Sequence, residues 1–272
     1  MKNYGKSTKK YNEKKERPAQ NFAESDECLA VGRNAVKELL SGERDIEKIY
    51  VQRGEHEGSI KVLIAMARER KIPVTEVDKV KMDSISGGTN HQGIIALASE
   101  RNYSTLDDIL AYAEEKGEKP FVILLDGVED PHNLGAIIRS AECCGAHGVI
   151  ISKRRAVGLT PVVSKASAGA IEYMRVAKVT NLAATLDELK EKGFWVYGAD
   201  MGGKEYYSTD FSGSVCLVLG SEGFGISRLV REKCDFIVSI PLYGNVNSMN
   251  VSCAGAVLFA EIAKQKQQSG GK

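Results

Sequence analysis

Polar side chains gather in three segments that each follow an apolar, strand-like run. These segments are "LDGVEDPHNLGAIIRSA" (125–141), "LGSEGFGIS" (219–227) and "YGNVNSMNVS" (243–252). They carry five side chains that could act on a substrate: Asn133, Arg139, Glu222, Ser248 and Asn250. Open α/β sheets bind ligands beyond the carboxyl ends of their strands. We therefore expect the three segments to form one polar site.

Each segment taken alone also has a plain structural explanation. Asn133 could cap a helix, and Arg139 could be an ordinary surface residue. The G-x-x-G-x-G spacing of the second segment could be a cofactor loop or only a tight turn. The third segment could be a polar surface loop in which Ser248 or Asn250 caps the next helix. Glu222 would repel a phosphate, so its position suits a cationic ligand or a hydroxyl donor better.

The residue types at this site exclude several kinds of chemistry. None of the five is a His or a Cys, so nucleophilic and metal-dependent hydrolysis lose support. The glycine spacing is neither the dinucleotide G-x-G-x-x-G nor a P-loop, which disfavours a nucleotide-binding oxidoreductase. What remains is chemistry in which the protein mainly orients two substrates.

The composition is that of a globular cytoplasmic protein. The chain has 272 residues, of which 43% are hydrophobic and 27% charged. No apolar run approaches a membrane span, and the N-terminus has no apolar segment typical of a secretory signal. The six cysteines form no C-x-x-C pair and indicate reduced, buried thiols. The four histidines are scattered, so we predict no metal site.

Charge is concentrated at the N-terminus. Residues 1–20 contain seven Lys or Arg and two Glu, a net +5, within a chain of net +1. This segment lacks apolar periodicity, and we expect residues 1–25 to be a disordered tail. The tail could grip phosphates or could only aid solubility, and the sequence favours neither.

The remaining chain divides into two modules. Residues 26–99 alternate between helical and strand-like patterns, beginning with a helix, and predict a small α/β module. Residues 100–118 contain a polar linker and a leading helix. Residues 119–268 contain nearly continuous apolar strands separated by helices. This pattern predicts a parallel sheet covered on both faces, with an irregular region after "GVIIS".

The trio "DPHNLGAIIRSA", "LGSEGFGIS" and "IPLYGNVNSMNVS" resembles the three motifs of SPOUT-class RNA 2′-O-ribose methyltransferases, the SpoU/TrmH subfamily. The motifs agree in order and spacing. The front module, ending in "GTNHQGIIA", resembles that family's ribosomal-protein-like substrate-binding domain. Met249 stands where Leu is usual and Ser221 where Ala is frequent, and neither difference affects the chemistry.

The resemblance implies an α/β SPOUT catalytic domain with a C-terminal trefoil knot, S-adenosyl-L-methionine as methyl donor, no metal, and a homodimer with shared active sites. By family position, the donor contacts fall at Leu219, Gly220, Ser221, Ile240 and Met249. Arg139 would be the central catalytic residue. Because a guanidinium does not readily lose its proton, we assign it to clamping a phosphate and stabilising the oxyanion. Asn133, Ser248 and Asn250 would orient the ribose, and Glu222 would fix the site by hydrogen bonds.

The expected substrate is the ribose 2′-hydroxyl of an RNA, and the front module favours a guanosine of large-subunit (23S) rRNA. A tRNA ribose methyltransferase is the alternative. A non-catalytic RNA-binding protein is disfavoured because all five polar residues are present. We expect the front module to contact RNA, because the motif loops carry no cluster of base-stacking aromatics. Its candidate contacts are Arg33, His91 and Gln92, with Lys37, Lys79 and Lys81 as further basic residues; a solvated charged face would explain these charges nearly as well.

Overall fold

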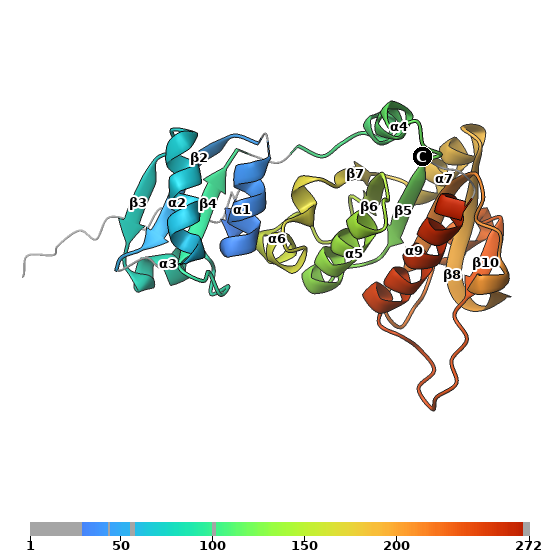
Figure 1. Cartoon of the computed structure of the whole chain (residues 1–272). Helices are drawn as coiled ribbons and strands as arrows, with labels where there is room; N and C mark the ends of the chain where they lie inside the picture. The colour runs from blue at the N-terminus through green and yellow to red at the C-terminus, as the bar shows by residue number, and fades with distance from the viewer. Residues whose placement is uncertain (1–28, 43, 55–57, 100–101, 269–272) are drawn as a thin grey trace, which may run out of the picture.

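The computed structural model describes residues 29–42, 44–54, 58–99 and 102–268 and contains two sheets in two modules (Figure 1). The predicted N-terminal tail lies outside the described residues. Among the helices that are described, none is both long and apolar enough to cross a bilayer.

The front module is a four-stranded mixed sheet with three helices. Its elements are β1 (Leu29–Val31), α1 (Arg33–Ser41), β2 (Ile46–Gln52), α2 (Ser59–Glu69), β3 (Val74–Val77), α3 (Lys79–Ile85) and β4 (Ile94–Ala98). The strand order is β1-β4-β2-β3; β2 and β3 run parallel, and the other pairs are antiparallel. The module therefore begins with a strand, and the predicted helical start was wrong. A three-residue strand is too short to show alternation.

The second module contains a fully parallel six-stranded sheet, which confirms the prediction. Its strands are β5 (Phe121–Asp126), β6 (Gly148–Ser152), β7 (Arg175–Val179), β8 (Phe194–Glu205), β9 (Ser214–Gly220) and β10 (Phe236–Ser239), in the order β10-β8-β9-β5-β6-β7.

Helices cover both faces of this sheet. They are α4 (Leu106–Glu115), α5 (Pro131–Cys143), α6 (Pro161–Ala166), α7 (Leu182–Glu191), α8 (Arg228–Lys233) and α9 (Val251–Gln268), with single 3₁₀ turns η3 (Ala170–Glu172) and η4 (Tyr206–Ser208). Side chains alternate along a strand. Phe121 and Ile123 of β5 accordingly join a core with α5 and α9, while Val122 and Leu124 join a second core with α4 and α7.

The region expected to be irregular contains α6, η3 and the edge strand β7. Thr160 accepts a hydrogen bond from Val163 N at 3.4 Å and caps α6, whose first residue is Pro161. This part of the chain also contacts the front module, since α6 packs against β1. Tyr173 Oη donates to Glu38 Oε2 at 2.6 Å across the same contact, and that carboxylate raises the pKa of Tyr173 to about 12.

Candidate active site

Three loops meet at the carboxyl edge of the parallel sheet, as the sequence predicts. The loops follow β5, β9 and β10; β9 pairs directly with β5, and β8 lies between β9 and β10. Asp126, the last residue of β5, accepts a hydrogen bond from Ser227 N at 2.7 Å through Oδ2. This bond holds the loop after β9 against the end of β5.

One hydrogen-bond network joins a residue from each loop. Asn133 Nδ2 donates to Glu222 Oε1 at 3.1 Å. Asn250 Nδ2 donates to the same oxygen at 2.6 Å and to Asn133 Oδ1 at 2.9 Å. Asn133 is only 7% exposed, whereas Glu222 and Asn250 are exposed. Three side chains that are 28 to 117 residues apart in the sequence therefore form one cluster.

Asn250 has a second task as the cap of α9. Its Oδ1 accepts from Ser252 N at 3.0 Å and from Cys253 N at 3.3 Å, which satisfies N–H groups at the start of the helix. Its amide nitrogen remains directed to Asn133 and Glu222. Asn133, by contrast, is not a cap, because Asp130 accepts from His132 N at 3.1 Å and starts α5.

The glycine-rich loop is a tight turn closed by backbone hydrogen bonds. Ser221 and Gly225 pair through two backbone hydrogen bonds of 3.0 Å each, and Gly223 (φ 86°) and Gly225 (φ 65°) adopt left-handed conformations. A Cβ on Gly220 would lie 2.1 Å from the carbonyl carbon of Gly225. Only glycine permits this approach, so the turn packs directly on the end of β9.

A cavity of about 650 Å³ opens between the loops after β9 and β10. The buried side chains of Leu219, Val238 and Leu258 form an apolar wall of this cavity. Glu222, Ser248 and Asn250 supply polar groups. The remaining positions predicted to contact the donor also line it: Gly220, Ser221, Ile240 and Met249. The cavity can hold a ligand with an apolar ring and polar ends.

Arg139 does not line this cavity. It lies on α5 six residues after Asn133, which is about 9 Å further along the helix and about 120° around it. Its side chain is exposed and makes no hydrogen bond or ion pair with the described residues. A single chain therefore does not bring all five predicted polar residues together.

The structure corrects the interpretation of the cysteines. Cys216 is buried, but Cys143 on α5 and Cys253 on α9 are exposed, because only one face of each helix packs on the core. Burial raises the pKa of the Cys216 thiol and raises that of Cys234 to about 11, so neither is a ready nucleophile. Within the described ranges, no group of three or more His, Cys, Asp or Glu could hold a metal ion.

Two cavity residues were missed in the sequence. Asp200, on β8, lines the cavity and forms an ion pair with Arg231. Its position at the carboxyl end of the strand-like "FWVYGAD" run was an available signal. Phe224, in the glycine-rich turn, also lines the cavity and is 94% exposed. An aromatic ring between two glycines was the corresponding signal.

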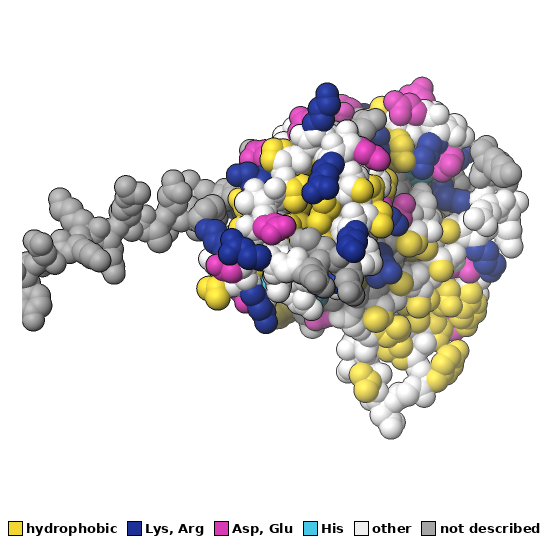
Figure 2. All heavy atoms as spheres, turned by 60° about the vertical axis from the view of Figure 1, so that its left-hand side comes forward, with side chains coloured by type: hydrophobic (Ala, Val, Ile, Leu, Met, Phe, Trp, Pro, Cys, Tyr) yellow, Lys and Arg dark blue, Asp and Glu magenta, His cyan; other side chains and the backbone are white. Residues whose placement is uncertain are grey.

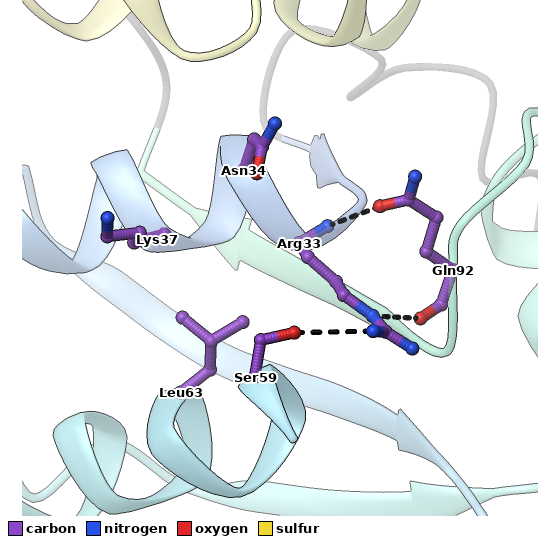
Figure 3. Close-up of a pocket in the computed structure, with 6 residues that line it drawn as sticks. All are labelled: Arg33, Asn34, Lys37, Ser59, Leu63 and Gln92. Atoms are coloured by element: carbon purple, nitrogen blue, oxygen red, sulfur yellow. Dashed lines mark hydrogen bonds between the residues drawn. The ribbon is translucent and has the colours of Figure 1, made fainter. Parts of the chain in front are cut away.

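The front module has its own hollow, of about 570 Å³, around Arg33 (Figure 3). The Arg33 guanidinium donates to Gln92 O at 3.2 Å and to Ser59 Oγ at 3.3 Å, while Gln92 Oε1 accepts from Arg33 N at 3.1 Å. Arg33 and Gln92 also line an adjoining hollow together with His91. His91 is buried and Asp83 Oδ1 lies 3.2 Å from its Nε2.

Comparison with known proteins identifies related chains for both modules. The SpoU rRNA Methylase family matches residues 120–260, and a domain described as RNA 2'-O ribose methyltransferase substrate binding matches residues 29–104. A Bacillus subtilis protein assigned to the TrmH family of tRNA/rRNA methyltransferases is 45% identical over 88% of this chain and 96% of its own. A Staphylococcus haemolyticus protein assigned to the same family is 43% identical over 90% of this chain and 98% of its own.

Solved structures show the same fold. A TrmH-family protein from Porphyromonas gingivalis superposes with a TM-score of 0.67 at 27% identity, over 88% of this chain and 89% of that one. The SpoU methyltransferase AviRb from Streptomyces viridochromogenes, solved with AdoMet, gives a TM-score of 0.73 at 22% identity, over 90% of this chain and 91% of that one. The family match over 120–260 and the 45% identity establish membership. The chain belongs to the SpoU/TrmH family of RNA methyltransferases.

Proposed function

We propose that this protein transfers a methyl group from S-adenosyl-L-methionine to a ribose 2′-hydroxyl of RNA. The observation that carries the proposal is the network of Asn133, Glu222 and Asn250, which stands beside a cavity made by the loops after β9 and β10. Such a site orients two substrates without a protein nucleophile, and the family supplies the reaction class.

The cavity residues fit the methyl donor. Leu219, Val238 and Leu258 offer an apolar surface for a purine ring, and the absence of a Cβ on Gly220 lets the loop backbone close on the cavity. Glu222 places a carboxylate in the cavity wall, which suits a positively charged ligand. When bound, S-adenosyl-L-methionine supplies an electrophilic methyl group on a sulfonium.

The polar residues then act on the ribose. The amides of Asn133 and Asn250 hold Glu222 Oε1, so the carboxylate stays in one place. Ser248 presents a hydroxyl from the third loop and can orient the 2′-hydroxyl together with this carboxylate. Arg139 clamps a neighbouring phosphate and stabilises the charge that develops on oxygen. It does not take the proton, because guanidinium remains charged at any pH of interest; the hydroxyl proton would pass to solvent water as the methyl group leaves sulfur for oxygen.

We propose that the Arg139 that acts at each cavity comes from a second copy of the chain. It is exposed on α5 and lies outside the cavity of its own chain, and α5 packs beside α9, whose first turn borders that cavity. We propose a homodimer in which α5 of one copy faces the cavity of the other. We also propose the C-terminal trefoil knot that the motif resemblance implies, and a cytoplasmic location with the RNA.

The favoured substrate is a guanosine of 23S rRNA, and tRNA is the alternative. The front module, residues 26–99, supports a structured RNA because it adds polar hollows distant from the methyl-transfer loops. Arg33, Gln92 and His91 line them, with exposed Lys37 and Lys79 nearby. Figure 2 shows further Lys and Arg side chains spread over this module. We propose that it holds RNA while residues 119–268 perform the transfer.

Two measurements test the function. S-adenosylhomocysteine should raise the melting temperature and NAD should not; the reverse would contradict a methyltransferase. Arg139→Ala should abolish transfer to RNA while retaining binding of S-adenosylhomocysteine. The matched control is Arg228→Ala, which removes another exposed arginine, on α8, and should remain active. Near-normal turnover of Arg139→Ala would contradict its assigned role.

The RNA itself is identified by mapping ribose methylation in rRNA and tRNA from cells with and without the gene. A methyl mark lost only from 23S rRNA supports the favoured substrate, and one lost only from tRNA supports the alternative. Loss of a base methyl instead of a ribose methyl would contradict the proposed acceptor atom.

A further inference from the structure

The turn that holds Glu222 also carries Phe224, whose side chain is almost entirely uncovered by the part of the chain that the structure describes. Phe224 is 94% exposed, the highest value among the exposed large hydrophobic residues that are described. The described residues contain no aromatic ring stacked against it, whereas exposed Trp195 contacts Phe236. Full burial of a Phe side chain contributes roughly 1.5–3 kcal/mol, and here almost none of this is realised within the chain.

The backbone that carries the ring is held next to the proposed reaction centre. Ser221 and Gly225 close the turn with two 3.0 Å backbone hydrogen bonds, and Glu222 is held by Asn133 and Asn250. Phe224 is only two residues beyond Glu222, so their Cα atoms are no more than about 7 Å apart. A tight turn therefore carries an exposed ring within reach of a nucleotide whose ribose meets Glu222.

We propose that Phe224 stacks on the base of the nucleotide whose ribose is methylated, an inference that rests on the proposed function. A ribose can enter the cleft only if its nucleotide leaves the surrounding RNA stack, and its base then needs a new surface. An exposed aromatic face provides one for any base, at about 1–3 kcal/mol. This proposal differs from the sequence-based expectation that the motif loops offer little to a base, which did not consider a ring presented by a glycine turn.

The alternative occupants of this ring fit less well. The adenine of the methyl donor can instead pack on the apolar cavity surface formed by buried Leu219, Val238 and Leu258, away from water. A second chain copy could cover Phe224, since Figure 2 shows hydrophobic side chains gathered where the loop before α9 projects, and Tyr243 and Val246 of that loop are exposed. However, Phe224 belongs to the turn that carries Glu222, the carboxylate proposed to face the ribose.

The test uses the full-length protein and three variants, Phe224→Ala, Phe224→Leu and Phe224→Trp. Leu229→Ala, at a 61% exposed apolar residue on α8, is the matched control. Stacking predicts that Phe224→Ala lowers kcat/KM on cognate RNA about 5- to 150-fold, the equivalent of 1–3 kcal/mol. Phe224→Leu should fall nearly as far, because it keeps apolar area but no π face. Phe224→Trp and the control should remain close to the native protein.

Three further measurements separate the base from other occupants. The Kd of S-adenosylhomocysteine and the molar mass by light scattering should be unchanged in all variants. On RNA with an abasic residue at the mapped position, the native protein and Phe224→Ala should have equal kcat/KM. The proposal is overturned if Phe224→Leu is fully active, if Phe224→Ala weakens S-adenosylhomocysteine binding or changes the mass, or if its defect persists on abasic RNA. Failure of the native protein to methylate any ribose would instead overturn the proposed function.

Discussion

Replacing Asn133 with Asp tests the hydrogen-bond network most directly, because the substitution keeps the shape and changes one donor into an acceptor. Asn133 Nδ2 lies 3.1 Å from Glu222 Oε1, so the new carboxylate would face an existing one at that distance. Two charges so placed repel by about 1 kcal/mol in water and about 5 kcal/mol at an effective dielectric of 20. Because Glu222 is exposed and Asn133 is buried, we expect roughly 1.5–3 kcal/mol of destabilisation at pH 8.

This penalty should depend on pH with a defined sign. The introduced carboxyl has its folded pKa raised by Glu222 above the unfolded value near 3.9. Stability is therefore retained below that unfolded pKa and is lost as the pH rises through the raised folded pKa. The difference in unfolding free energy from the native protein should be small near pH 4 and should reach its full size by about pH 7.

Urea unfolding followed by tryptophan fluorescence provides the assay. Trp195, the only tryptophan of the chain, lies on β8 and reports the catalytic module alone. The matched control is Asn181→Asp, because Asn181 caps α7 by accepting from Ala184 N and has no hydrogen bond to a carboxylate among the described residues. An aspartate at a cap is favourable, so this variant should be neutral or slightly stabilised. A penalty for Asn133→Asp that is equal at pH 4 and pH 8, or equal to that of the control, would refute the network.

Two other predictions concern the cavity wall and the opposite end of the sheet. Gly220→Ala would place a Cβ 2.1 Å from the Gly225 carbonyl carbon, so calorimetric binding of S-adenosylhomocysteine should weaken at least about tenfold and the free energy of unfolding should fall by about 1–3 kcal/mol. The control is Gly244→Ala, whose new Cβ would have no atom within 4 Å and should be neutral. Equal behaviour of the two variants would contradict the close-packed turn. His147 Nδ1 accepts a hydrogen bond from Phe121 N at 3.0 Å, and burial lowers the pKa of this histidine. The contribution of His147 to stability is therefore full above pH 6.5 and is lost as the pH falls toward the folded pKa. His147→Asn should reduce the loss of stability between about pH 6.5 and 5, and an unchanged pH profile would contradict this assignment.

The sequence by itself determined the architecture of the second module. "FVILLD" and "SVCLVLG" are apolar at every position except at an end. This pattern is typical of a strand that is covered on both faces. The structure places both in the centre of the parallel sheet. The strands β1 and β7 were not predicted, because the first has three residues and the second is an edge strand with charged Arg175 and Lys178. Pairing with neighbouring strands decides such segments, and that pairing is not local information.

The sequence also determined which residue types could form a site, since Asn133, Glu222 and Asn250 each follow a strand. Only the tertiary structure decided that these three meet on one carboxylate oxygen, because contacts across 89 and 117 residues depend on strand order. It also decided that Arg139, about 120° around α5 from Asn133, does not line the cavity of its own chain. The exposure of Phe224 was likewise decided by the tertiary structure. Its two glycine neighbours permit a tight turn, but only the packing of that turn against Gly220 leaves the ring in solvent.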